Sequence, residues 1–236
     1  MDARPNRIEA KPVNRKIAPR RVLADHVYDQ LMASLVDGEL TAGSSLNIDA
    51  LANEMEVSQS PIREALARLE GTGLVRRTAL KGYWVAPMLT TEELVELMDA
   101  RLVLEPVNAF LACQTANQEL LANLDQSITD FQNAPTGRTF SEFRSYWQAD
   151  EHFHMLIAAA ANNRFLLSAY TALGGHLQRF RLFAGLGVTD AEHATKEHAL
   201  VRDAFRAGDA VQAREAMQAH INGVKARAVK ESQALG

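Results

Sequence analysis

Four side chains in the second half of the chain have types and spacing that could hold a metal ion. Asp150 and His154 are four residues apart in a segment with helical periodicity, so they share one helix face. His198 and His220 lie in two later helical segments. One carboxylate and three imidazoles meeting inside a bundle would suit Zn²⁺ first, and also Ni²⁺, Mn²⁺ or Fe²⁺. Such a site keeps open positions for water or a ligand oxygen.

The alternative is that these histidines are satisfied polar residues on amphipathic helices, and their spacing alone leaves this open. His152 lies on a different side of its helix from His154, so we exclude it as a ligand. We expect Glu151 and Glu197, which adjoin candidate ligands, to point elsewhere. The remaining histidines fit no ligand spacing and are expected to be surface or capping residues: His26, His176 and His193.

A second segment that could do chemistry, Val57–Leu69, combines arginines with an apolar stripe at helical spacing. A helix of this kind can lie in a DNA groove, with its apolar face against the preceding helix. Arg63 could donate two hydrogen bonds to guanine O6 and N7, and Gln59 could pair with adenine. An ordinary amphipathic helix with a solvated arginine face is the alternative. The residues of this segment expected to contact DNA are Ser58, Gln59, Ser60, Arg63 and Arg68.

The neighbouring sequence predicts the elements that would hold this helix. Two helices are expected before it and two short strands after it, at residues 21–38, 48–55, 74–77 and 83–85. Asn47 should cap the second helix and Ser60 the third, with Pro61 at its first position. The order helix, helix, helix, hairpin predicts a winged helix-turn-helix over residues 21–87. Its wing would bring further basic residues to phosphate or the minor groove: Arg76, Arg77 and Lys81.

The chain after Pro87 is predicted to be helical throughout. Thr90 and Glu93 form a capping box that opens the first helix. Helices are expected at residues 91–117, bent at Pro106, and then at 118–133, 140–161, 163–185, 190–207 and 209–230. The fold class is therefore mainly α: a winged helix-turn-helix followed by an all-α antiparallel bundle over residues 88–236.

Composition and charge fit two modest domains. Of the 236 residues, 47% are hydrophobic and the net charge is −4. Residues 1–20 lack apolar periodicity and are expected to form a disordered basic arm, which is either merely solvated or in contact with phosphates. The single cysteine, Cys113, fits a reducing compartment. Because we find neither a signal peptide nor an apolar run long enough to span a bilayer, we expect a cytoplasmic protein with no membrane partner.

The DNA-reading segment also carries a family resemblance. The run Val57-Ser58-Gln59-Ser60-Pro61-Ile62-Arg63-Glu64-Ala65-Leu66, with Gly73 and Gly82 after it, strongly resembles the N-terminal domain of GntR-family transcription regulators. In that family, the arginine at the position of Arg63 and the wing glycine at Gly82 contact DNA, and the resemblance implies the same contacts here. Many members carry arginine at the position of Gln59, and some carry one at that of Asp49. We therefore do not assume that this chain binds the operator sequence of the family.

The metal candidates carry a second resemblance. Asp150-Glu151-His152-Phe153-His154, Glu197-His198 and Met217-x-x-His220 resemble the metal-binding pattern of the FadR C-terminal (FCD) domain. The resemblance implies the ligands Asp150, His154, His198 and His220. Arg101 matches an arginine that lines the effector cavity, where it would clamp a carboxylate; the alternative is a surface ion pair with Glu105. Arg179 and Arg181 are weaker candidates for effector binding.

Together the two resemblances imply a ligand-responsive DNA-binding transcription regulator, and they favour a repressor over an activator. A homodimer would bind a two-fold operator, and a small organic acid would bind the metal and Arg101 to modulate operator binding. One alternative keeps the regulator but makes the metal purely structural. The other, a metal-dependent hydrolase, is disfavoured because we find no HExxH run, so we expect that the protein is not an enzyme.

Overall fold

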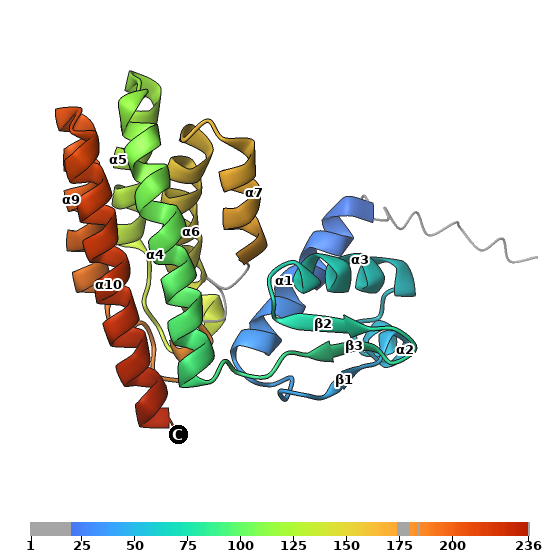
Figure 1. Cartoon of the computed structure of the whole chain (residues 1–236). Helices are drawn as coiled ribbons and strands as arrows, with labels where there is room; N and C mark the ends of the chain where they lie inside the picture. The colour runs from blue at the N-terminus through green and yellow to red at the C-terminus, as the bar shows by residue number, and fades with distance from the viewer. Residues whose placement is uncertain (1–19, 174–179, 184, 236) are drawn as a thin grey trace, which may run out of the picture.

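A computed structural model describes residues 20–173, 180–183 and 185–235, which form a small head and a helical bundle side by side (Figure 1). The basic arm expected at residues 1–20 lies outside this part of the chain, apart from Arg20, where the first helix begins. The same is true of His176 and Arg179.

The head is a winged helix-turn-helix, as predicted. Its helices are α1 (Arg20–Val36), α2 (Ile48–Glu54) and α3 (Gln59–Glu70), and its strands are β1 (Ser45–Leu46), β2 (Val75–Thr78) and β3 (Gly82–Val85). The sheet is antiparallel with the order β1-β3-β2. Strand β1 was not predicted, because two residues are too few to show an alternating pattern.

The predicted start of α3 is wrong by two residues. The residue that caps α3 is Ser58, so Ser60 lies inside the first turn and Pro61 is the third helical residue. Proline fits there because the first N–H groups of a helix have no intrahelical partner. The cap of α2 is confirmed, since the Asn47 side chain accepts hydrogen bonds from the backbone N–H groups of Asp49 and Ala50.

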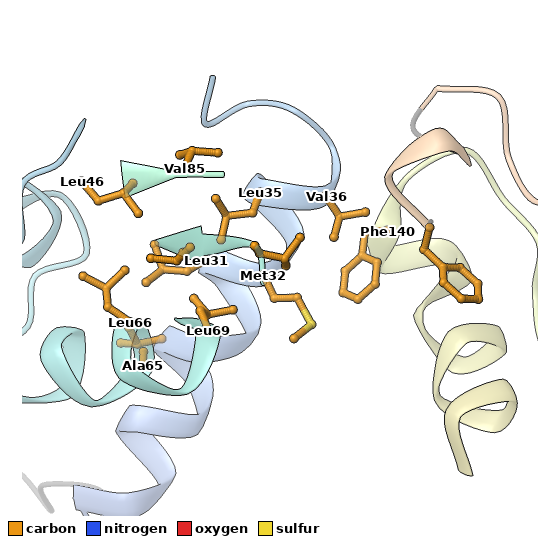
Figure 2. Close-up of a cluster of buried hydrophobic side chains, with 14 of the residues drawn as sticks. Leu31, Met32, Leu35, Val36, Leu46, Ala65, Leu66, Leu69, Val85 and Phe140 are labelled. Carbon is orange, nitrogen blue, oxygen red and sulfur yellow. The ribbon is translucent and has the colours of Figure 1, made fainter. Parts of the chain in front are cut away.

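The buried face of α3 holds the head together and fixes its outer face. Ile62, Leu66 and Leu69 are fully buried and belong to one cluster with Leu31 and Leu35 of α1. Figure 2 shows Leu66 and Leu69 with Leu31 and Leu35 in this cluster. Fully burying a side chain of this size contributes about 1.5–3 kcal/mol. Since residues three and four apart share one face, burying this stripe leaves the other side of α3 exposed to solvent.

The bundle consists of long helices joined by short connections (Figure 1). The capping box of Thr90 and Glu93 is confirmed, and Pro106 lies inside a continuous first helix. The predicted helix over residues 163–185 is wrong in its last part, because residues 181–183 form a 3₁₀ turn. The structure describes an α-helix over Arg164–Leu173, and residues 174–179 lie outside the described part of the chain. The elements are α4 (Thr91–Gln114), α5 (Gln118–Asn133), α6 (Phe140–Ala160), α7 (Arg164–Leu173), η1 (Arg181–Phe183), α9 (Ala191–Ala207) and α10 (Ala210–Leu235).

The head rests on the N-terminal end of α6. Asp37, which follows α1, accepts a hydrogen bond from the backbone N–H of Phe140 at 2.7 Å, and Arg144 pairs with Asp29 of α1 at 2.5 Å. The Phe140 ring belongs to the same buried cluster as Val36 (Figure 2). Helix α6 therefore carries the docking contacts at one end.

A further contact involves Arg181, which the sequence offers as a weaker candidate for effector binding. Its Nη1 donates to the backbone carbonyls of Ala86 and Pro87 at 3.0 and 3.2 Å. These carbonyls belong to the segment that joins head and bundle, so Arg181 ties that segment to η1. The sequence could not show this, because the contact joins residues more than ninety positions apart.

Candidate metal centre and nucleic-acid interface

Three helices bring the four predicted metal ligands together inside the bundle. Asp150 and His154 lie one turn apart on α6, His198 lies on α9 and His220 on α10. All four side chains are buried, with exposed fractions of 5% or less.

The donor atoms of these residues face one another. The Nε2 atom of His220 is 3.2 Å from that of His198 and 3.3 Å from that of His154. The Asp150 Oδ1 atom lies 3.5 Å from His198 Nε2 and 3.9 Å from His154 Nε2. Three ring nitrogens thus lie close together with one carboxylate oxygen beside two of them, and these are the atoms of the N₃O donor set expected from the spacing.

The outer nitrogens of two of these rings lie next to carboxylates. His154 Nδ1 is 2.6 Å from Glu105 Oε2, and His220 Nδ1 is 2.9 Å from Glu197 Oε2. Because a carboxylate accepts, the Nδ1 atom of His220 carries the proton, and the Nε2 atom of the neutral ring then presents a lone pair to the centre. Burial lowers the pKa of His198 and of His220, and the hydrogen bond to Glu197 opposes that effect at His220. A cation at the centre would accept the Nε2 lone pair of His220.

The Asp150 carboxylate gives independent support for a cation. Among the described residues, no Lys or Arg lies within ion-pair distance of this 5%-exposed group, and its charged-group contacts are to imidazoles. An ionised carboxylate in such a place is costly unless a positive charge compensates it. The residues present therefore fit a divalent metal ion.

One expectation about the neighbouring acids is wrong, because Glu197 contacts His220 rather than pointing elsewhere. Glu151 is partly buried and accepts a hydrogen bond from the Tyr170 hydroxyl at 3.5 Å. Burial raises the pKa of Glu151 to about 7, and Asp150 adds to the shift. Helical periodicity predicts which residues share a face of one helix, but it does not show which neighbouring helices cover that face. Glu105 and Tyr170 were missed for the same reason.

Arg101 lies beside the centre and is buried, with 1% of its surface exposed. Its Nε donates to Glu105 Oε1 at 2.5 Å and its Nη2 to Oε2 at 3.4 Å. The alternative of an Arg101–Glu105 pair is thus realised, but inside the protein rather than on its surface. Since a guanidinium has five N–H donors, the pair leaves Arg101 further donors for a ligand.

The start of α3 presents the predicted base-reading residues to solvent. Ser58, Gln59 and Arg63 are exposed and Ser60 is partly exposed. Arg63 Nη2 donates to Gln59 Oε1 at 3.0 Å, and the Gln59 amide donates to Asp49 of α2. This network holds Gln59 and Arg63 on one exposed patch.

Arg68 behaves differently from Arg63. It pairs with Asp25 at 2.6 Å and lies 4.1 Å from the centre of the Tyr28 ring, so it is turned toward α1. Its predicted DNA contact would have to compete with these partners.

The wing is the hairpin formed by β2 and β3. Arg76, Arg77 and Lys81 are all exposed on it, and Lys81 Nζ lies 5.5 Å from the centre of the Trp84 ring. Gly82 has φ +83°, a conformation that side chains rarely adopt, so glycine is needed at this turn. The wing thus offers positive charge on the surface of the head.

No described helix combines the length and apolar character that a membrane-spanning segment needs.

Comparisons with known proteins agree with this architecture. The family described as "FCD domain" matches residues 96–223, and "Bacterial regulatory proteins, gntR family" matches residues 23–85. An uncharacterized HTH-type transcriptional regulator, BphR, of Paraburkholderia xenovorans is 28% identical over 90% of this chain and 87% of its own. A probable D-xylose utilization operon transcriptional repressor of Paenarthrobacter nicotinovorans is 26% identical over 86% and 87%. The solved structure of E. coli McbR/YncC covers 88% of this chain and 97% of its own, with 20% identity and a TM-score of 0.67.

Proposed function

We propose a metal-dependent, acid-responsive repressor, on the premise that this chain belongs to the GntR family of bacterial regulatory proteins and carries an FCD domain. As a member it is a DNA-binding transcriptional regulator and not an enzyme. The finer proposal concerns the metal, the effector and the sign of regulation.

The observation that carries the proposal is the convergence of three imidazole nitrogens and one carboxylate oxygen beside a buried arginine. Asp150, His154, His198 and His220 would hold a divalent cation, with Zn²⁺ the first candidate. The bound cation would supply positive charge to an effector oxygen. Arg101 would donate its free N–H groups to the effector carboxylate, and burial would strengthen that charged hydrogen bond.

Thermal unfolding of the purified protein tests this proposal against a purely structural metal. The apo protein, the Zn²⁺-loaded protein and the Zn²⁺-loaded protein with each of a panel of small organic acids are compared. A sensor gains further stability with at least one acid, by RT ln(1 + [L]/Kd) for a ligand that binds only the folded state. A structural metal would raise the melting temperature by itself, and no acid would add to it.

On the DNA side, we propose that a homodimer presents two α3 helices to a two-fold operator. Arg63 and Gln59 would read bases, and Ser58, Ser60, Arg76, Arg77, Lys81 and the Gly82 turn would contact backbone or minor groove. Arg68 stays a weaker member of this set, since Asp25 and Tyr28 already engage it.

Helix α6 offers the route from the effector to the DNA. It carries Asp150 and His154 in the bundle and, two to three turns earlier, Phe140 and Arg144 against the head. An effector that prefers one arrangement of α6 would thereby favour one placement of the two heads, in proportion to its differential affinity. Release from DNA on acid binding is the favoured outcome. The P. nicotinovorans relative, which is named as a probable repressor, supports the proposal that this protein represses transcription.

Replacing Arg101 with Ala is expected to weaken acid binding about 10–100-fold, as measured by calorimetric titration of the Zn²⁺-loaded protein. Arg101→Lys should lose most of the same affinity, because an ammonium group cannot form the planar two-point contact. The lysine variant keeps a cation beside Glu105, so a folding defect in Arg101→Ala does not block the test.

The matched control for Arg101 is Arg206→Ala, which removes an arginine that is half-exposed and pairs with Asp125 elsewhere on the bundle. Its titration should equal that of the parent protein. Unaltered acid binding in Arg101→Lys and Arg101→Ala would show that another residue holds the carboxylate.

A further inference from the structure

A chain of charged contacts extends outward from His220. Glu197 of α9 accepts from His220 Nδ1 at 2.9 Å through its Oε2 atom. Arg227 of α10 holds the same carboxylate with both terminal nitrogens, Nη1 to Oε1 at 2.7 Å and Nη2 to Oε2 at 2.8 Å. Its Nε donates to Asp190, the residue that precedes α9, at 3.0 Å. Three residues, Glu197, Arg227 and Asp190, thus fix the orientation of the His220 imidazole.

The geometry of these contacts sets the tautomer of His220. The Glu197 carboxylate, held by two hydrogen bonds from Arg227, accepts the Nδ1 proton of His220. In that tautomer the Nε2 lone pair of His220 faces the Nε2 atoms of His198 and His154.

The backbone leaves room for this carboxylate at Gly223. A Cβ atom at this position would lie 2.5 Å from Glu197 Oε1 and 2.9 Å from Arg227 Nη1. Both distances are too short for non-bonded atoms, so any side chain at residue 223 would push the Glu197–Arg227 pair aside. Glycine is also a poor helix former, so its place in the middle of α10 calls for a reason of this kind.

We infer that Glu197 and Arg227, accommodated by the missing side chain of Gly223, are positioning residues that hold His220 as a metal ligand. The inference deepens the proposed function and rests on it. His154 has a similar arrangement with Glu105 and Arg101, but there the arginine is also the proposed effector contact. The hydrogen bonds of Arg227 go to the outer carboxylates of Glu197 and Asp190, so its effect on the metal passes through Glu197.

The test uses Co²⁺ as the probe with the full-length protein, since its visible absorption reports the number and geometry of its ligands. The variants are Gly223→Ala and Glu197→Gln, each compared with the parent protein in a chelator-competition titration. Both variants should bind Co²⁺ about 10–100-fold more weakly and with an altered visible spectrum. Gly223→Ala removes no polar group and adds a better helix former, so weaker binding there is not explained by loss of the helix.

Two controls separate this inference from the proposed metal site. Glu192→Gln alters an exposed acid of α9 that pairs with Lys196, and it should bind Co²⁺ as the parent does. His220→Ala should lose most Co²⁺ affinity. If His220→Ala is impaired while Gly223→Ala and Glu197→Gln match the parent, the positioning role is wrong and the metal site stands. If His220→Ala also binds normally, the metal site itself is wrong.

Discussion

Replacing Arg63 with Ala is expected to abolish specific operator binding while the protein remains folded. The side chain is exposed and donates a hydrogen bond to Gln59, so the core of the head loses nothing. A bidentate arginine–guanine contact accounts for about 1–3 kcal/mol of base discrimination at each half-site, and a two-fold operator doubles the loss. Quantitative footprinting on a selected operator, with circular dichroism of the same sample, measures both effects.

Two variants serve as controls for Arg63. Arg68→Ala removes an arginine of the same helix that is turned toward Asp25 and Tyr28, and it should reduce specificity much less. Arg76→Ala should weaken binding to all duplexes alike and lower the salt dependence by about one phosphate contact per head. A footprint that Arg63→Ala leaves unchanged would refute the assignment of α3 as the base-reading helix.

The double variant Asp150→Ala with His220→Ala is expected to strip the metal from the protein. It removes the carboxylate and one of the three imidazoles, so His154 and His198 remain as the only members of the N₃O set. Two imidazoles hold a divalent ion weakly, and the stabilisation that metal gives the parent protein should disappear. Elemental analysis after gel filtration measures the first effect and thermal unfolding with added Zn²⁺ the second.

His152→Ala is the matched control for this double variant. His152 lies on α6 between the two predicted ligands but is exposed, so its loss should leave the metal content unchanged. Full metal stoichiometry in the double variant would rule out the site.

Much of the fold could be predicted because its elements carry local patterns. The stripe of Ile62, Leu66 and Leu69 predicted the buried side of α3, and the Thr90–Glu93 box predicted where α4 begins. The start of α3 was predicted less well. A serine and a proline near a helix start fit more than one cap position, and tertiary packing decides between them.

The ligands of the candidate metal site could be predicted from the sequence, but their hydrogen-bond partners could not. The spacing of Asp150 and His154 follows from one helical turn, and the structure places these two residues with His198 and His220. The partners Glu105, Glu197 and Arg227 could not be found from spacing. Each contact of Glu197 with α10 depends on how that helix packs beside α9, and no periodicity along one helix contains that information.

Selection of bound sequences from a random pool of duplex DNA tests whether α3 reads a specific operator and whether the metal and the acid control that binding. The purified protein is used with Zn²⁺, with and without the acid that stabilises it most. We expect enrichment of one inverted repeat that is bound through Arg63. We also expect the bound fraction of that repeat to change when the acid is added to the Zn²⁺-loaded protein. Failure to prefer any duplex over bulk competitor DNA, under every metal and acid condition, would contradict both expectations.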